Sequence, residues 1–184
     1  DLLLSINCSS VQIESADFLP KFESICAAAG YPLERLQLEI TEQTLVRQVE
    51  LAAANIQSLR AKGVRVAIDD FGMGYSSLTY LRQFPVDVLK IDRTFIQDIQ
   101  TLAQARVGVS LADAIIAMAK SLGLELIAEG VEYPAQISYL RQQACDTAQG
   151  FLFSEPCNAA HMQRQLDEGG FAHLLAAAPP IEKS

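Results

Sequence analysis

Acidic and amide side chains recur along this sequence directly after short apolar runs. Asn7 follows Leu-Ser-Ile, Glu39 follows Leu-Gln-Leu, and Asp69 with Asp70 follows Val-Ala-Ile. The set continues along the chain with Glu42, Lys90, Asp92, Glu129, Glu132 and Gln149. Hard oxygen ligands without histidine or cysteine select Mg²⁺, Mn²⁺ or Ca²⁺ over zinc. The pattern therefore indicates chemistry at a divalent metal ion.

The spacing of these residues leaves room for one strand and one helix between successive members. A single carboxylate at a strand end is most often a helix cap or a loop residue. Several carboxylates on one small face repel one another, and a fold tolerates them where cations lie among them. Lys90 is the cation of the set. It can orient a water or stabilise charge on a phosphoryl group, or form salt bridges to the neighbouring carboxylates.

The elements that must position these residues are strands buried on both faces, alternating with amphipathic helices, as in a parallel sheet. Six strands are predicted, at residues 2–7, 36–40, 64–69, 86–91, 125–128 and, more weakly, 149–153. The carboxyl ends of such strands converge on one face in a barrel. The polar residues would meet on that face.

The helices between these strands follow from apolar periodicity and from start and stop residues. Residues 111–122 are predicted as one helix, Pro134 begins another, and Asn158 caps a third. An earlier helix ends before Gly63 and has one apolar face made by Leu45, Val49, Ala52, Ile56 and Leu59.

The fold class predicted is α/β, a (β/α)8 TIM-type barrel. A doubly wound sheet is not favoured, because the sequence lacks the glycine fingerprint of nucleotide-binding folds. Such a barrel needs eight strands, and only six are visible in the 184 residues. We therefore expect about six of the eight βα units, with the barrel incomplete at the N-terminus. The barrel would occupy residues 1–175, and residues 176–184 would form a frayed tail.

Composition narrows the class of protein further. The formal charge of −8 opposes binding to long nucleic acid, whose affinity comes largely from lysine and arginine. Neither a membrane-spanning apolar run nor a signal peptide is visible, so a soluble, cytoplasmic protein is predicted. Four cysteines without a C-x-x-C pair are predicted to be buried free thiols. His161 and His173 fall away from the strand ends, which disfavours a histidine base.

A glycine-containing loop begins with the two acids and reads Asp-Asp-Phe-Gly-Met-Gly-Tyr-Ser-Ser over residues 69–77. Its glycines permit turns beside a ligand. The Asp-Phe-Gly triplet occurs in protein kinases, but their His-Arg-Asp and Val-Ala-Ile-Lys motifs are missing here. A G-x-x-x-x-G-K-[ST] phosphate loop is missing too, so nucleoside triphosphate chemistry is not indicated.

From about Leu4 to Pro156 the chain resembles the EAL-type cyclic di-GMP phosphodiesterases of bacterial signalling. Six motifs carry the resemblance, in the family's order: Ser-Ile-Asn-Cys-Ser, Leu-Glu-Ile-Thr-Glu, Ala-Ile-Asp-Asp-Phe-Gly-Met-Gly-Tyr-Ser-Ser-Leu, Leu-Lys-Ile-Asp-Arg-Thr-Phe, Ala-Glu-Gly-Val-Glu and Ala-Gln-Gly-Phe. The first is a mild variant that leaves the ligand Asn7 intact. The Glu-Ala-Leu that names the family does not occur in the 184 residues, and its glutamate would be one more metal ligand.

The resemblance implies a role for each matching residue. Asn7, Glu39 and Asp69 would ligate one metal ion, and Asp70 would bridge to or hold a second, with Asp92 as a further contributor. Two ions of Mg²⁺, or of Mn²⁺, are expected. Lys90 would position or activate the attacking water, and Glu129 and Gln149 would hold metal-bound water and substrate. Glu42 would anchor the loop after Asp70, and Glu132 would support the site from behind.

The implied reaction is hydrolysis of cyclic di-GMP to linear pGpG. The family also implies a homodimer, attached sensory or GGDEF-type domains, and a cytoplasmic location, either alone or as part of a larger membrane-bound protein. The isolated chain is expected to be inactive, because it lacks one ligand and leaves the barrel open. Two alternatives stay open. The first is a catalytically inactive receptor or protein-interaction module, which binds cyclic di-GMP without cutting it and signals by contacting a partner. The second is an unrelated enolase-like barrel that uses Lys90 as a base.

Overall fold

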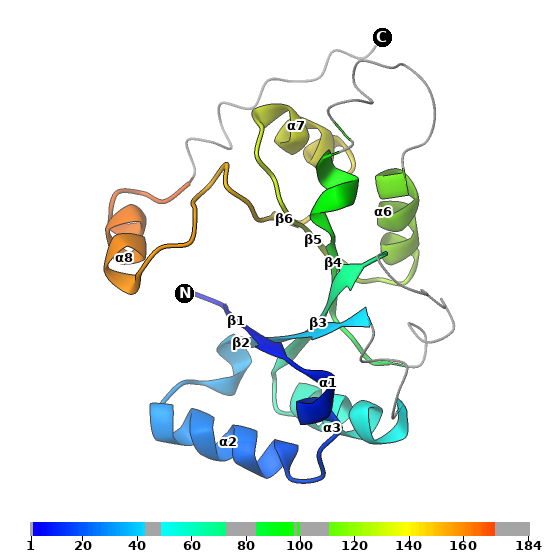
Figure 1. Cartoon of the computed structure of the whole chain (residues 1–184), viewed down its shortest axis with the longest axis vertical. Helices are drawn as coiled ribbons and strands as arrows, with labels where there is room; N and C mark the ends of the chain where they lie inside the picture. Colours follow the sequence, from blue (N-terminus) through cyan, green and yellow to red (C-terminus); the bar gives the residue numbers. More distant parts are fainter. Residues whose placement is uncertain (1, 43–48, 73–83, 98, 100–110, 172–184) are drawn as a thin grey trace. The chain divides into compact units, whose positions relative to one another are not determined.

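The computed structural model describes residues 2–42, 49–72, 84–97, 99 and 111–171 (Figure 1). The loop prediction beyond Gly72, the tail at 176–184, His173 and Leu45 lie outside the described residues. The chain divides into two compact units, which are described in turn. The first comprises Asp1–Lys90 and Leu122–Glu125, and the second Ile91–Ser121 and Leu126–Ser184.

Among the described residues, six strands follow one another in the sheet in the order of the chain. They are β1 (Leu4–Cys8), β2 (Leu36–Thr41), β3 (Arg65–Phe71), β4 (Val88–Ile91), β5 (Glu125–Ala128) and β6 (Thr147–Ala148). The pairs β1–β2, β2–β3 and β5–β6 are parallel. A doubly wound sheet would reverse its strand order part-way. The unbroken order confirms the predicted α/β class, with six strands of a (β/α)8-type barrel.

The helices of the first unit lie along one side of β1 to β3 (Figure 1). They are α1 (Ser10–Ile13), α2 (Phe18–Ala29) and α3 (Val49–Ala61), and a 3₁₀ turn, η1 (Leu33–Arg35), leads into β2. The α3 residues Ala52, Ile56 and Leu59 are fully buried, as the periodicity predicted.

The end of α3 confirms the predicted stop at Gly63. Its φ of 89° lies in the left-handed region that favours glycine. The amides of Gly63 and Val64 donate to the carbonyls of Arg60 and Leu59, which closes the helix just before β3 begins.

Strand β2 is buried from Leu36 to Ile40, including its polar residues. Because successive side chains of a strand point to opposite faces, Gln37 and Glu39 share one face while Leu36 and Leu38 share the other. The register pairs Glu39 with Asn7 on β1 and with Ala67 on β3.

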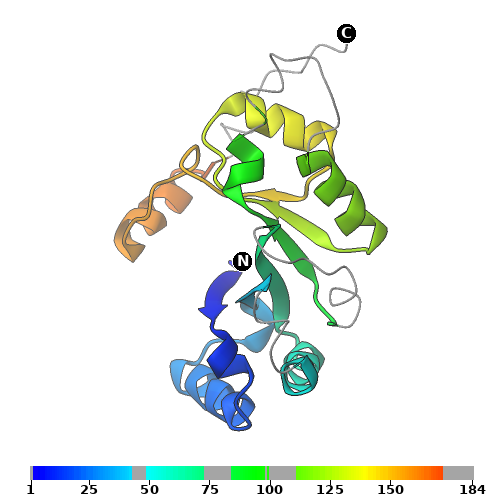
Figure 2. The ribbon, with the colours of Figure 1, turned by 45° about the vertical axis from the view of Figure 1, so that its right-hand side comes forward.

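The second unit contains α6 (Leu111–Ser121), α7 (Pro134–Gln142) and α8 (Ala159–Asp167), which Figure 2 shows from a second direction. Pro134 opens α7, and the side chain of Asn158 caps α8 by accepting from the amide of His161. Both predicted helix starts are confirmed.

The prediction of a final strand at 149–153 was wrong, because the strand lies earlier, at Thr147–Ala148. Residues 151–153 form a turn in which the Phe153 amide donates to the Gly150 carbonyl at 3.0 Å. At Gly150 the chain passes so close to Val131 that an added Cβ would lie 2.2 Å from the Val131 carbonyl oxygen. That close approach requires glycine at position 150.

Two further sequence predictions concern thiols and membranes. All four cysteines are free thiols, and Cys8 and Cys26 are buried, as predicted. The prediction that the other two are buried was wrong, because Cys145 is half-buried and Cys157 is exposed. Within the described ranges, no helix has both the length and the hydropathy that crossing a membrane requires.

Candidate functional site

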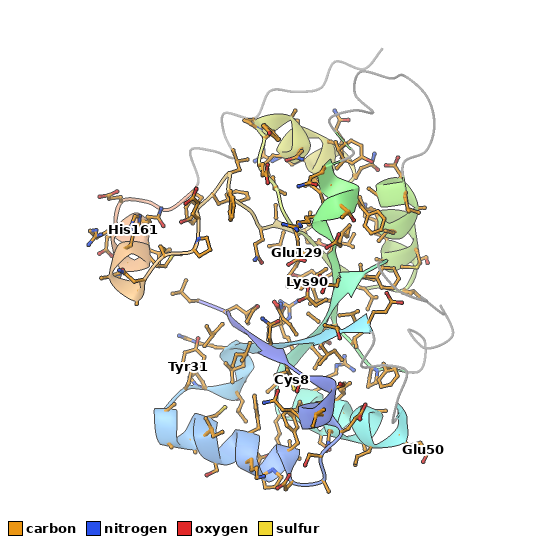
Figure 3. All side chains as sticks on the ribbon, in the orientation of Figure 1. Cys8, Tyr31, Glu50, Lys90, Glu129 and His161 are labelled. Atoms are coloured by element: carbon orange, nitrogen blue, oxygen red, sulfur yellow. The ribbon has the colours of Figure 1, made fainter. Side chains whose placement is uncertain are left out.

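A buried lysine holds two carboxylates together in the first unit. Lys90, on β4, is 3% exposed, and its Nζ lies 2.6 Å from Glu39 Oε2 and 2.9 Å from Asp69 Oδ1 (Figure 3). The carboxylates come from β2 and β3, so three strands contribute one group each. Lys90 thus forms salt bridges to neighbouring carboxylates, one of the roles that its sequence position suggested.

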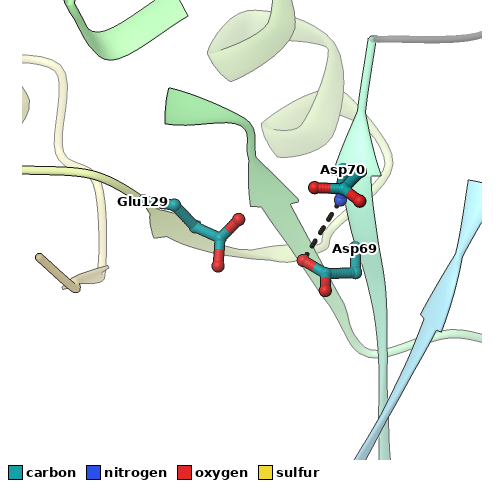
Figure 4. Close-up of side chains that lie close together, drawn as sticks. All are labelled: Asp69, Asp70 and Glu129. Atoms are coloured by element: carbon teal, nitrogen blue, oxygen red, sulfur yellow. Dashed lines mark hydrogen bonds between the residues drawn. The ribbon is translucent and has the colours of Figure 1, made fainter. Parts of the chain in front are cut away.

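Asp70 continues the acidic group beyond Asp69 in an unusual backbone conformation. Its φ is 53°, in the left-handed region that few residues other than glycine adopt, although aspartate tolerates it better than most. Its amide donates to Asp69 Oδ1 at 3.1 Å (Figure 4). Backbone conformations of this kind cost energy and concentrate at functional sites.

Glu42, just past the end of β2, is 8% exposed and contacts the backbone that follows Asp70. Its Oε2 accepts a hydrogen bond from the amide of Gly72 at 3.3 Å. The carboxylate therefore holds the first residues after β3 against the end of β2.

Asn7 lies on β1, directly beside Glu39 in the parallel register. The residue is exposed, and the next residue, Cys8, is buried. Burial raises the pKa of the Cys8 thiol to about 11, so the thiol is neutral near pH 7.

Three predicted site residues of the second unit follow its strands. Asp92 comes directly after β4, and its Oδ1 accepts from the amide and the hydroxyl of Thr94, at 2.9 and 2.6 Å. Glu129 follows β5, is half-buried, and donates its amide to the Ile91 carbonyl. Gln149 is exposed just after β6, and its backbone bonds to Ala128 and Val131.

Glu132 is exposed in the second unit. Its amide donates to Oε1 of the buried Gln136 at 2.8 Å. His161 is exposed on α8 (Figure 3). The structure thus brings Asn7, Glu39, Asp69, Asp70 and Lys90 together in the first unit, and it places Asp92, Glu129 and Gln149 at successive strand ends in the second.

Comparison with known proteins decides the family. A model of the EAL domain matches residues 1–156. The chain belongs to the EAL domain family. This confirms the resemblance that the sequence motifs indicated.

Among curated proteins, this EAL domain is similar to the cyclic di-GMP phosphodiesterase NbdA of Pseudomonas aeruginosa, with 39% identity over 180 residues. The match covers 98% of this chain and 22% of NbdA, so the chain spans about a fifth of the length of that relative.

Two solved structures show the same fold. The PaMucR phosphodiesterase in complex with c-di-GMP is 34% identical, with a TM-score of 0.77, over 87% of this chain and 64% of that one. The manganese/cy-diGMP complex of BlrP1 from Klebsiella pneumoniae is 30% identical, with a TM-score of 0.72, over 84% of this chain and 39% of that one.

The donor set of this EAL domain suits a hard divalent cation. In the first unit Glu39, Asp69 and Asp70 carry three negative charges, while Lys90 supplies one positive charge at Glu39 and Asp69. Asn7, which pairs with Glu39 in the parallel register, offers an uncharged amide oxygen as a further ligand. Carboxylate and amide oxygens are the ligands that Mg²⁺, Mn²⁺ and Ca²⁺ prefer.

Sequence reasoning missed one polar residue of this group, Gln37. It is 1% exposed, and its Nε2 donates to Glu39 Oε1 at 3.5 Å. A polar residue two positions before Glu39 on the same strand face was the available clue.

Proposed function

We propose that this EAL domain hydrolyses cyclic di-GMP to linear pGpG with the help of two divalent metal ions. The observation that carries the proposal is the buried Lys90, held by Glu39 and Asp69 at the carboxyl ends of adjacent strands. The names of NbdA and PaMucR, both phosphodiesterases, support the substrate and the reaction class.

The metal ligands proposed in the first unit are Asn7, Glu39 and Asp69 for one ion and Asp70 for the second. Asp92 of the second unit would contribute to the second ion while it also accepts from Thr94. The manganese complex of BlrP1 supports Mn²⁺ as well as Mg²⁺. When bound, two such ions lower the pKa of a water and offset charge on the attacking and leaving oxygens.

Lys90 is proposed to position the attacking water. Its ammonium group has three donor protons, and the contacts to Glu39 and Asp69 fix where Nζ lies. From there it can donate to the water or to a phosphoryl oxygen, which orients the water and stabilises developing negative charge. In the second unit, Glu129 and Gln149 are proposed to hold water and substrate.

Two acids are proposed to support the site without touching the reacting atoms. Glu42 holds the backbone after Asp70 through the Gly72 amide. The left-handed Asp70 lies between Asp69 and this anchored segment, so the anchor restrains the direction of the Asp70 carboxylate. Glu132 is proposed to act from behind the site in the second unit.

The setting of the domain is proposed from the same family. We propose a cytoplasmic homodimer, attached to sensory or GGDEF-type domains in the complete protein, in which residues 1–175 form the phosphodiesterase barrel. The match to only 22% of NbdA supports a larger complete protein. Light scattering of the purified complete protein measures its oligomeric state directly.

The decisive experiment follows cyclic di-GMP in the complete protein with Mg²⁺, with separation of the nucleotide products. We expect pGpG to accumulate, and we expect Glu39→Gln to slow turnover by at least about 100-fold, because one ligand charge is lost. The control is Lys62→Met, which removes an exposed ion pair to Glu23 and should leave turnover unchanged. Binding of cyclic di-GMP without any product would refute the enzyme and establish the receptor alternative.

A further inference from the structure

Gln37 is a buried amide beside the proposed metal ligand Glu39. It lies in the middle of β2, is 1% exposed, and shares a strand face with Glu39. Its Nε2 donates to Ser5 Oγ on β1 at 3.1 Å and to Glu39 Oε1 at 3.5 Å. The side chain therefore connects β1 to the Glu39 carboxylate.

The orientation of the Gln37 amide follows from chemistry. An ionised carboxylate only accepts hydrogen bonds, so the NH₂ end of the amide must face Glu39. The other end, Oε1, then has no hydrogen-bond partner among the described residues, although it is buried. Arg65, beside Gln37 in the register, pairs with Glu125 instead.

An unpaired buried acceptor destabilises a fold. An apolar side chain of similar volume would avoid this cost, so the stability of β2 does not explain a glutamine here. The buried Gln136 differs in this respect, because its Oε1 accepts from the amides of Glu132 and Tyr133 at 2.8 and 3.0 Å. Asn55 on α3 is buried as well, and its Nδ2 donates to the carbonyls of Ile13 and Ser15 at 2.7 and 3.2 Å.

We infer that Gln37 is a positioning residue for Glu39, a role that rests on the proposed metal-dependent function. Glu39 receives one donor at each carboxylate oxygen, Lys90 at Oε2 and Gln37 at Oε1. Two donors at different oxygens fix the plane of the carboxylate. Groups that orient metal ligands in this way typically change metal affinity by roughly 10-fold to 100-fold when they are lost.

The test compares Gln37→Met with the parent in the complete protein, with Mn²⁺ alone as the probe in calorimetric titrations without cyclic di-GMP. We expect Mn²⁺ to bind about 10-fold more weakly, at the lower end of the usual range, because the 3.5 Å contact is long. In EDTA, the melting temperature should be unchanged or higher, because the unpaired acceptor is removed.

The matched control is Asn55→Leu, another buried amide of the first unit that lies away from the acidic group. It should lower the melting temperature, because two carbonyls lose their donor, and leave Mn²⁺ affinity unchanged. A lower melting temperature with unchanged Mn²⁺ affinity in Gln37→Met would overturn the inference, and so would a parent that binds no Mn²⁺. Intact Mn²⁺ binding with no hydrolysis by the parent would refute the proposed reaction alone.

Discussion

Replacing Lys90 with methionine removes the positive charge between Glu39 and Asp69 and keeps the side chain similar in length. In the parent, Nζ lies 2.6 and 2.9 Å from the two carboxylates, and Lys90 is 3% exposed. The variant leaves two largely buried negative charges without their shared counterion. We expect a large loss of stability in the absence of metal and a loss of turnover in its presence.

The magnitude follows from the distances and the burial. At an effective dielectric constant of about 20, each contact corresponds to roughly 6 kcal/mol of attraction. Desolvation of Lys90 offsets much of it, and removing one partner of a buried pair typically costs about 3–5 kcal/mol. For a domain of about this size, each kcal/mol lowers the melting temperature by roughly 2–4 °C, so a decrease of about 6–20 °C is expected in EDTA.

The assay is thermal unfolding of the complete protein in EDTA and in saturating Mg²⁺, followed by the rate of pGpG formation. Because a divalent cation can neutralise Glu39 and Asp69 in place of the ammonium group, Mg²⁺ should stabilise Lys90→Met more than the parent. The control is Lys62→Met. The Lys62 contact to Glu23 is 2.8 Å long, but the side chains are 41% and 35% exposed, so a loss below about 1 kcal/mol is expected.

Equal melting temperatures of Lys90→Met and Lys62→Met in EDTA would show that burial does not strengthen the Lys90 contacts. Equal stabilisation of Lys90→Met and the parent by Mg²⁺ would show that the cation does not bind beside Glu39 and Asp69. Either result contradicts the electrostatic argument for the site.

Three further outcomes are expected. Asp70→Gly should abolish turnover. It should change the free energy of unfolding in urea by less than about 1 kcal/mol, because glycine adopts the φ of 53° without the energetic cost that aspartate has there. A large destabilisation would contradict this. Gly130→Ala should destabilise the protein by roughly 2 kcal/mol or more, since its φ is 66° and an added Cβ would lie 2.3 Å from Arg93 Cβ. Gly123→Ala, with φ 71° and nothing within 4 Å, should cost less. Because burial raises the pKa of Cys8 from 9.0 to about 11, the unfolded chain ionises first, and the free energy of unfolding should fall as pH rises from 9 to 11. Cys8→Ala should reduce that dependence, and an unchanged slope would show that the Cys8 thiol is not its source.

Much of the fold was predictable because the local pattern carries it. Three features that depend only on neighbouring residues are confirmed. They are the periodic burial of Ala52, Ile56 and Leu59, the end of α3 before Gly63 and the start of α7 at Pro134. The last strand was misplaced because its end depends on the contact between Gly150 and Val131. Val131 is brought to Gly150 by packing, which a local pattern does not encode.

The sequence by itself determined which chemistry is available: acidic and amide oxygens at strand ends, in the order of EAL motifs. Only the tertiary structure decided how these groups interact. Lys90 reaches Glu39 across 51 residues of chain, and Gln37 reaches Ser5 across 32. Aspartate tolerates the left-handed conformation of Asp70, but its residue type does not require it. Such contacts depend on the parallel register of the strands, which brings the ends of adjacent strands together and buries the charged side chains of Glu39 and Lys90.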